Sequence, residues 1–243
     1  MIRILVHGAC GHMGRILCGL IEKSDKFELA GRVDAMGEGV MKTLDEFEGQ
    51  TDMVIDFSFH TTAPAIIDWA LRHNTAVMIA TTGHTEEERK IITDASERIP
   101  VFYSATMSVG VALLANMAKK AAAVFPDADI EIVESHHNRK VDAPSGTALL
   151  FANKIKEARP GAEIVSGRSG MSKRQENEIG ISSLRLGNLP GTHEVIINTG
   201  NQQISFKHEV FDRSLFAEGA LSAAEFLYGR EAGLYDMYSI FND

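Results

Sequence analysis

The residues with the clearest chemical potential lie close together near the middle of the chain. His136, His137, Arg139 and Lys140 place two imidazoles, a guanidinium and an ammonium group within five positions. Such a cluster can hold an anion and can also move protons near neutral pH. A solvated basic loop would explain any one of these side chains, but it explains their combination poorly. The cluster therefore indicates a site that binds an acid and exchanges protons with it.

A predicted helix start follows the cluster directly. Pro144 and Ser145 precede Gly146, Thr147 and the apolar run at 148–151, an order typical of a capped helix N-terminus. The free N–H groups at such a terminus form a carboxylate or phosphate site. A proton donor beside an anion site is what an enzyme acting on small acids needs.

A glycine-rich loop near the start of the chain points to a nucleotide. Residues 8–14 read Gly-Ala-Cys-Gly-His-Met-Gly, one residue off the common dinucleotide fingerprint. The loop follows a strand pattern at 2–6 and opens a helical pattern. Asp34 ends the next predicted strand, twenty positions after the last glycine of the loop. Together these features predict a site in which the pyrophosphate lies at the helix N-terminus. The alternative is a glycine turn that only packs a helix on a sheet.

Asp34 also bears on which nucleotide binds. A carboxylate at this position can accept hydrogen bonds from both ribose hydroxyls of NAD, and it repels the 2′-phosphate of NADP. His12 in the glycine loop and Arg32 on the same strand face as Asp34 could partly offset that repulsion. We therefore expect NADH to be the preferred cofactor and NADPH to be usable.

Short apolar runs typical of buried strands alternate with helical patterns in the first part of the chain. The strand patterns lie at 2–6, 27–34, 53–57, 75–80 and 101–104. Helical patterns between them include 63–73 and 85–97. This rhythm predicts a Rossmann-like, doubly wound parallel sheet.

The pattern changes beyond residue 107. Helices are predicted at 111–125, from about 145 and at 215–230, and strands at 129–134, 181–186, 194–198 and 202–210. Residues 167–180 have the composition of a mobile loop. Gly-Asn pairs at 187–188 and 200–201 predict hairpin turns. We therefore expect an α/β protein with a second, α+β domain built on a mixed or antiparallel sheet.

The composition of the 243 residues narrows the class of partner. Hydrophobic residues make up 44%, enough for a packed core, and the net charge of −9 argues against nucleic acid and anionic membranes. No apolar run reaches the ~18 residues of a membrane helix. Cys10 and Cys18 are the only cysteines, eight positions apart in the glycine loop and the helix after it, and we expect neither a disulfide nor a bound metal. The histidines outside the cluster also show no metal-ligand spacing. These features predict a soluble, cytoplasmic protein that acts on a small molecule.

Residues 134–148 resemble the signature of the dihydrodipicolinate reductases, the bacterial and plant enzymes of lysine and diaminopimelate synthesis. Every fixed position of E-x-H-H-x-x-K-x-D-A-P-S-G-T-A is met here. The resemblance extends to residues 8–14, 81–83, 107–111, 219–220 and 233–237. It implies reduction of 4-hydroxy-tetrahydrodipicolinate, a cyclic imine dicarboxylate, to tetrahydrodipicolinate with NADH or NADPH.

The resemblance also implies roles for individual residues. His136 is the expected catalytic proton donor and acceptor, and Lys140 is the second acid, beside a substrate carboxylate. His137 is expected to contact the substrate, and Gly146 and Thr147 to bind its other carboxylate. The positions expected to contact the cofactor are Gly8, Ala9, Cys10, Gly11, His12, Met13, Asp34, Ala80, Thr81, Thr82, Ser104, Ala105, Thr106 and Met107.

Three positions depart from the pattern of the family. Ala80 replaces the first glycine of its G-T-T-G turn, and Thr106 replaces an asparagine, so the contact of residue 106 with the nicotinamide loses an amide. Ala35 stands where many members carry arginine, which agrees with the expected preference for NADH.

The resemblance further implies how the chain is divided and assembled. Residues 1–107 and 216–243 are expected to form a discontinuous dinucleotide-binding domain, and residues 108–215 a domain for substrate binding and oligomerisation. The two domains are expected to close about joints near Met107 and Phe216. The predicted strands of the second domain would have exposed edges in a monomer, and relatives bury them in a tetramer. We expect a homotetramer.

Two alternatives compete with this interpretation. One is another two-domain oxidoreductase, such as a homoserine or aspartate-semialdehyde dehydrogenase. The latter needs a nucleophilic cysteine in its second domain, and no cysteine follows Cys18. The other is a non-catalytic sensor that binds NADH and changes its assembly. Such a sensor has no need of His136, His137 and Lys140 together.

Overall fold

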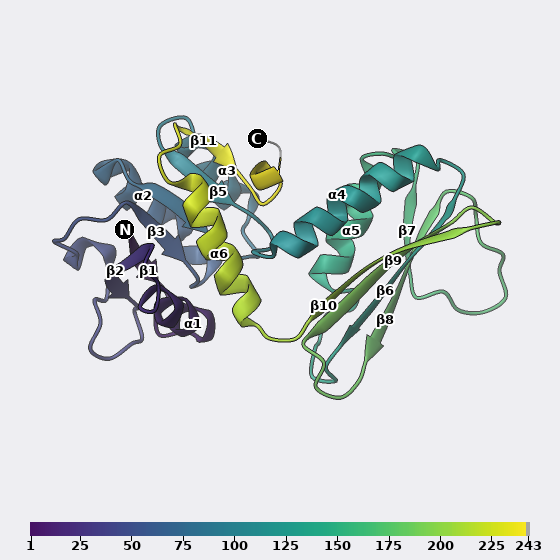
Figure 1. Ribbon diagram of the computed structural model, residues 1–243, viewed down its shortest axis with the longest axis horizontal. Helices are drawn as coiled ribbons and strands as arrows, with labels where there is room; N and C mark the ends of the chain where they lie inside the picture. The colour runs from purple at the N-terminus through teal and green to yellow at the C-terminus, as the bar shows by residue number, and fades with distance from the viewer. Residues whose placement is uncertain (242–243) are drawn as a thin grey trace. The chain divides into compact units, whose positions relative to one another are not determined.

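The computed structural model describes residues 1–241 and divides the chain into two compact units. The first unit comprises Met1–Ser108 and the chain from Arg213 onward, and the second comprises Val109–Asp212 (Figure 1). Within the described residues, no helix is both long enough and apolar enough to cross a membrane.

The first unit is built on a six-stranded sheet with the order β11-β5-β4-β3-β1-β2, in which every neighbouring pair is parallel. Its strands are β1 (Ile2–His7), β2 (Phe27–Val33), β3 (Met53–Asp56), β4 (Ala76–Ile79), β5 (Pro100–Tyr103) and β11 (Gly233–Tyr235). The predicted doubly wound sheet is thus confirmed. The apolar pattern had missed only β11, whose three residues are too few to show a pattern.

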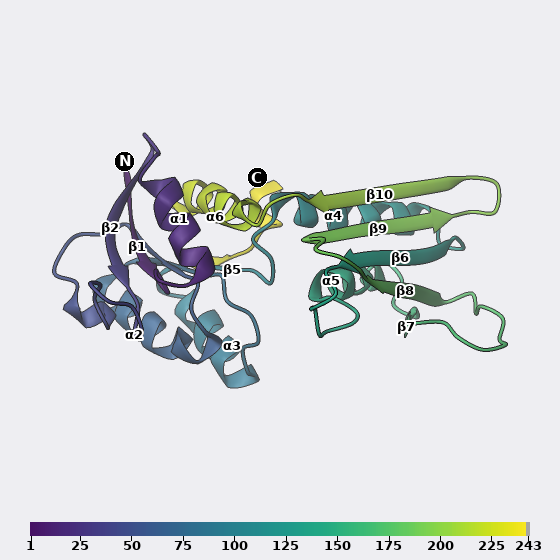
Figure 2. The same ribbon diagram turned by 90° about the horizontal axis from the view of Figure 1, so that it is seen from below.

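Helices cover both faces of this sheet. They are α1 (His12–Ile21), α2 (Ala63–His73), α3 (Glu86–Ala95) and α6 (Ser214–Leu227), with short 3-10 turns η1 (Leu44–Glu46), η2 (His60–Thr62) and η3 (Ser239–Phe241). Figure 2 shows α1 and α6 on one face and α2 and α3 on the other. A Cβ at Gly219 of α6 would lie 1.8 Å from the carbonyl oxygen of Met107, so only glycine lets the returning helix pack this closely.

The order of the strands sets where a ligand can bind in the first unit. The chain passes from β1 to β2 on one side and then crosses to β3 on the other side of β1. In open α/β sheets of this kind, ligands bind outside the carboxyl ends of the strands at such a reversal. The loops after β1 and β3 therefore flank the expected crevice.

The second unit is a five-stranded mixed sheet with the order β10-β9-β6-β8-β7. Its strands are β6 (Asp129–His136), β7 (Glu163–Ser166), β8 (Glu178–Arg185), β9 (Gly191–Asn198) and β10 (Gln203–Val210). Strand β8 runs parallel to β6 and β7, whereas β9 is antiparallel to β6 and β10. Helices α4 (Val109–Val124) and α5 (Gly146–Lys156) pack against this sheet. The mixed sheet was predicted, and β7 was not.

One of the two predicted hairpins is wrong. Strands β9 and β10 do form a hairpin, with Gly200 at φ +91° in its turn. Strand β6, however, lies between β8 and β9, so residues 187–188 do not join neighbouring strands. That turn pairs instead with the chain just after β6, where the N–H of His137 donates to the carbonyl of Leu189 at 2.9 Å. Local turn chemistry cannot show that a third strand enters between two others.

Arg174 ties the loop at 167–177 to strand β6. Arg174 contacts Asp129 at 2.8 Å and donates to the carbonyl oxygen of Ile130 at 3.1 Å. These contacts tie the loop to the first residues of β6, at the end of the strand opposite to His136.

Candidate active site

The basic cluster lies at the carboxyl end of β6. This strand ends at His136, two residues beyond its predicted end, and α5 begins at Gly146. Ser145 is the N-cap of α5, and its hydroxyl accepts a hydrogen bond from the N–H of Ala148 at 3.2 Å. Only nine residues connect the end of the strand to the first turn of the helix. Histidines and a helix N-terminus are therefore held at one end of the second unit, as the sequence predicted.

The side chain of Glu134 holds the ring of His136 through a hydrogen bond. Residues two apart on a strand face the same side, and both side chains turn into the protein: Glu134 is completely buried and His136 is 9% exposed. The carboxylate contacts Nδ1 of His136 at 2.5 Å and both terminal nitrogens of Arg185 at 2.8 and 2.7 Å. Burial opposes ionisation, but the bonds from Arg185 and His136 outweigh it and lower the pKa of Glu134 to about 2.

A second buried histidine lies beside His136. The ring centroids of His136 and His193 are 5.1 Å apart, and Nε2 of His193 lies 2.9 Å from the hydroxyl of Ser145. Burial, reinforced by the nearby His136, lowers the pKa of His193 to about 3. His193 is therefore neutral near pH 7, so it adds no second positive charge next to His136.

The sequence had given no role to Glu134, Arg185 or His193. Glu134 belongs to the signature, and its position two residues before His136 on a predicted strand was the signal that could have placed it under the histidine. Arg185 and His193 reach the site only through the pairing of β8 and β9 with β6. Nothing local in the sequence connects them to it.

The remaining predicted substrate residues lie on the segment between β6 and α5. The Nζ atom of Lys140 is 2.8 Å from a carboxylate oxygen of Asp142, and its backbone N–H donates to the carbonyl of His137 at 3.1 Å. Gly146 and Thr147 are the first two residues of α5. Such N–H groups have no partner within the helix, and theirs have none elsewhere among residues 1–241. Both remain available to an anion.

The glycine loop of the first unit forms a close-fitting cradle. Gly8 has φ +78°, and a Cβ there would lie 2.7 Å from the backbone nitrogen of Ser58. A Cβ at Gly14 would lie 2.1 Å from the carbonyl oxygen of Gly8. Helix α1 then begins at His12, and its N-cap, Gly11, offers no side chain to the first N–H groups. The loop thus presents backbone donors at a helix N-terminus, which suits a pyrophosphate.

Asp34 follows β2 and is bound to the glycine loop. One carboxylate oxygen accepts from the N–H of Cys10 at 2.9 Å, and the other accepts from Met36 at 2.9 Å and Gly37 at 3.1 Å. Burial opposes ionisation, but these backbone bonds outweigh it and lower the pKa of Asp34. A carboxylate offers about four lone-pair sites, and three are occupied. One lone-pair site of the carboxylate therefore remains for a further donor.

Two other residues near the cofactor region have partners of their own. Arg32 pairs with Glu22 of the chain following α1, so it is less able to offset repulsion between Asp34 and a phosphate. The hydroxyl of Thr106 accepts from the N–H of Ser108 at 3.2 Å. The threonine that replaces asparagine thus stabilises its own turn.

A hollow of about 300 Å³ lies over the ends of β3 and β4, between residues 57–60 and Ala80, Thr81 and Thr82. Beneath it, the fully buried Asp56 contacts Nδ1 of His7 at 2.9 Å and accepts from the hydroxyl of Thr81 at 3.3 Å. This network joins the ends of β1, β3 and β4, and the loops after β1 and β4 carry most of the predicted cofactor contacts.

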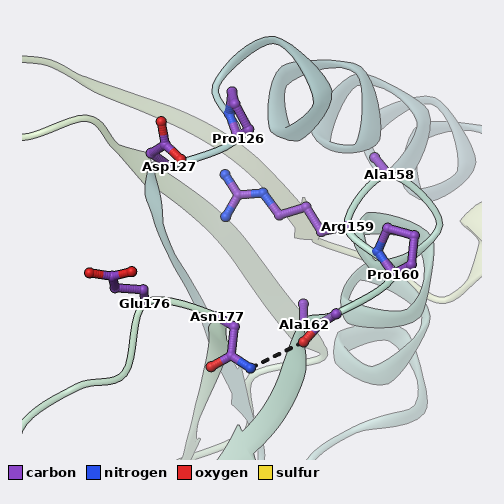
Figure 3. Close-up of a pocket in the computed structure, with 9 residues that line it drawn as sticks. Pro126, Asp127, Ala158, Arg159, Pro160, Ala162, Glu176 and Asn177 are labelled. Carbon is purple, nitrogen blue, oxygen red and sulfur yellow. Dashed lines mark hydrogen bonds between the residues drawn. The ribbon is translucent and has the colours of Figure 1, made fainter.

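A separate hollow of about 580 Å³ in the second unit contains none of the predicted site residues (Figure 3). Arg159 crosses it and donates to backbone carbonyls of Ala128 at 2.8 Å and of Phe125 just beyond the end of α4. Asn177 bonds to the carbonyl of Gly161. The position of the Arg159 side chain is therefore explained by its hydrogen bonds to these backbone carbonyls.

Comparison with known families decides between the remaining interpretations. A family model described as "Dihydrodipicolinate reductase, N-terminus" matches residues 2–107, and one described as "Dihydrodipicolinate reductase, C-terminus" matches residues 110–241. The chain belongs to the dihydrodipicolinate reductase family. The family membership that the signature at 134–148 predicted is thereby confirmed, and the match extends over almost the whole chain.

Individual relatives agree with this membership. A 4-hydroxy-tetrahydrodipicolinate reductase of Caldanaerobacter subterraneus subsp. tengcongensis is 43% identical and covers 98% of this chain and 97% of the relative. One of Clostridium tetani is 38% identical, covering 100% and 98%. Among solved structures, a dipicolinate-bound dihydrodipicolinate reductase of Paenisporosarcina sp. TG-14 is 25% identical, with a TM-score of 0.83 and 97% of each chain covered.

Proposed function

We propose that this chain reduces 4-hydroxy-tetrahydrodipicolinate to tetrahydrodipicolinate in the diaminopimelate route of lysine biosynthesis. It is an NAD(P)H-dependent oxidoreductase of its family. One observation carries the proposal: His136, hydrogen-bonded to the buried Glu134, lies close in the chain to the uncapped first N–H groups of α5. This arrangement combines a proton donor with a carboxylate site at one end of a sheet.

The chemistry explains why both parts are needed. The reduced nicotinamide supplies a hydride to a ring carbon conjugated to the imine, and a proton must reach the enamine that results. The substrate carries two carboxylates, which need cations or N–H donors to bind and orient them. Groups that draw electron density from the ring also promote loss of the 4-hydroxyl group as water.

We assign the proton transfers to His136 and Lys140. His136 has its Nδ1 bound to Glu134, which leaves Nε2 to exchange a proton with the substrate. Lys140 lies on the connection between β6 and α5, and its contact with Asp142 is partly exposed. A substrate carboxylate can compete for that ammonium group, and the lysine then acts as the second acid.

We assign substrate binding to His137, Gly146 and Thr147. The two free N–H groups at the start of α5 favour one carboxylate through their direction and the helix dipole, and the hydroxyl of Thr147 adds a further donor. The name of the Paenisporosarcina relative states that it binds dipicolinate, a planar ring dicarboxylate. That name supports the proposal that the start of α5 binds a dicarboxylate of the same kind.

The first unit fits a dinucleotide, because its loop leaves room only for glycine at Gly8 and Gly14. We propose that the pyrophosphate lies on residues 8–13, the adenine ribose by Asp34, and the nicotinamide near Ala80–Thr82 and Ser104–Met107. Asp34 then favours NADH over NADPH. This preference rests on one ribose bond and on repulsion of the 2′-phosphate, and Arg32 offsets the repulsion less because it pairs with Glu22.

We propose further that the first unit is the dinucleotide-binding domain and the second the domain for substrate and assembly, in a cytoplasmic homotetramer. The edge strands of the second sheet, β10 and β7, each pair on one side only within the described chain. The side chains at Glu131, Val133, Glu194 and Ile196, which alternate with the buried core positions, remain partly accessible. A second copy packed on these surfaces would cover both.

The test is oxidation of NADH and of NADPH in the presence of dihydrodipicolinate synthase, which supplies the unstable substrate. The expected result is turnover that depends on the synthase and its substrates and that dipicolinate inhibits competitively. A folded protein that binds NADH but shows no turnover with either cofactor would refute the proposed function. Sedimentation of the same sample measures the oligomeric state.

A further inference from the structure

We infer that Glu134, locked in place by Arg185, is a positioning residue that keeps a proton on Nδ1 of His136, so that Nε2 is the atom that exchanges a proton with the substrate. This inference rests on the proposed function, because it assigns a role through His136. It concerns a pair of residues that do not themselves touch the substrate.

Both oxygens of the Glu134 carboxylate are fully hydrogen-bonded. One oxygen is bound to Nδ1 of His136 at 2.5 Å and to Nη1 of Arg185 at 2.8 Å. The other is bound to Nη2 of Arg185 at 2.7 Å and to the backbone N–H of Ser145 at 3.1 Å. Four donors meet the roughly four lone-pair sites of a carboxylate. A group bound on every side, and fully buried, cannot rotate away from the histidine.

An ionised carboxylate accepts hydrogen bonds and donates none. The contact at Nδ1 therefore requires a proton on that nitrogen, which fixes the tautomer of a neutral His136 with Nε2 unprotonated. The same carboxylate stabilises the imidazolium that forms when Nε2 takes a proton. Nδ1 thus anchors the ring, and Nε2 is left to exchange protons.

The surroundings of Nε2 agree with this division of roles. A Cβ at Gly191, the first residue of β9, would lie 3.0 Å from Nε2 of His136 and 3.4 Å from its Cδ2. Glycine thus leaves space on the side of the ring that the protein does not hold by hydrogen bonds. Any larger residue at 191 would press on the atom that has to reach the substrate.

Arg185 explains how a carboxylate can remain charged in this place. A buried, unpaired carboxylate would take up a proton rather than stay ionised. The planar guanidinium meets both oxygens at once, a geometry that lysine cannot reproduce. Arg185 reaches Glu134 because β8 pairs in parallel with β6 and places Arg185 opposite His136. Arg185 therefore acts on His136 indirectly, by keeping Glu134 ionised.

A structural role alone, tying β6 to β8 and α5, would predict a loss of stability and no change in proton transfer. The variant Glu134→Gln separates the two, because it keeps the size and an acceptor but removes the charge. We expect kcat to fall about 10²–10⁴-fold with KM for the substrate nearly unchanged, because the amide of glutamine can donate to Nδ1 and so admits the tautomer whose proton lies on Nε2. The pH–kcat/KM profile of the variant should be displaced from that of the wild type.

The experiment uses the full-length enzyme and two further variants. Glu134→Asp restores the charge and should bring kcat and the pH profile back toward those of the wild type. Asp129→Asn is the matched control, because Asp129 is also paired with an arginine, Arg174, but at the opposite end of β6. It should leave the profile unchanged. Circular dichroism and the midpoint of urea unfolding show whether each of the four proteins is folded, and NADH affinity, measured by fluorescence, should be the same in all of them.

A folded Glu134→Gln enzyme with the kcat and pH profile of the wild type would overturn the inference. Should that variant not fold, Glu134→Gln combined with Arg185→Met removes both charges and should show the same shift. A second measurement needs no variant of Glu134. In wild-type protein labelled with nitrogen-15 histidine and assigned by loss of signal in His136→Gln, neutral His136 should carry its proton on Nδ1. A proton on Nε2 would refute the inference even if the proposed substrate proves wrong.

Discussion

Asp34→Ser should shift the choice of cofactor from NADH toward NADPH. In the folded chain, three of the roughly four lone-pair sites of the Asp34 carboxylate are taken by the N–H groups of Cys10, Met36 and Gly37. One site on the oxygen nearest the glycine loop is left for a ribose hydroxyl. The substitution removes that bond, the negative charge and the anchor of the loop together.

The expected size follows from these three losses. One hydrogen bond to a charged group contributes about 1.5–3 kcal/mol, so kcat/KM for NADH should fall about 10–150-fold. A 2′-phosphate about 5 Å from the carboxylate, in water-like surroundings, is repelled by about 1–2 kcal/mol, so its relief favours NADPH by roughly 5–30-fold. The weaker loop anchor lowers kcat/KM for NADH and for NADPH alike, so it cancels in the ratio of the two. The ratio should therefore move by about 10²–10³-fold.

The assay measures kcat/KM for both cofactors at low and high salt, with the substrate supplied enzymatically. Asp34→Asn is the control, since it removes the charge and keeps one carbonyl acceptor, and its ratio should lie between those of the wild type and the serine variant. In the wild type the preference should weaken as salt rises, because screening acts on charge repulsion more than on hydroxyl contacts. A wild type that strongly prefers NADPH at low salt, or a ratio unchanged in Asp34→Ser, would show that Asp34 does not face the ribose.

Three further outcomes follow from the second unit. His136→Gln and Lys140→Met should each lower kcat by about 10²–10⁴-fold while NADH affinity, measured by titration, stays unchanged; near-normal turnover of the double variant would contradict their roles. Thr147→Val should lower kcat/KM by about 10–150-fold through loss of a hydroxyl bond to a carboxylate, and unchanged steady-state kinetics would mean that the backbone donors suffice. Because the pKa of Glu134 is lowered from 4.5 to about 2, its contribution of about 3 kcal/mol to the free energy of unfolding should be present above pH 4.5 and lost as the pH falls toward 2. Urea unfolding across this range should show a smaller acid-induced loss in Glu134→Gln.

The sequence by itself determined the local elements and the signature residues. Helix α2 was predicted with the bounds it has, Ala63–His73, and the cap at Ser145 was evident from the residues around it. The glycine loop, with a strand before it and Asp34 after it, indicated a nucleotide site. Apolar periodicity, caps and glycine turns act over a few residues, so they are visible in the chain itself.

The tertiary structure alone decided which residues surround these groups. Arg185 is 51 residues from Glu134 and meets it because β8 lies beside β6. The insertion of β6 between β8 and β9 also removed a predicted hairpin and brought His193 next to His136. Asp34 had a predicted ligand, but the three backbone donors that already hold it depend on how the loop folds back. Strand pairing and buried ion pairs gain their free energy only when distant segments close together, and no short window of sequence records that closure.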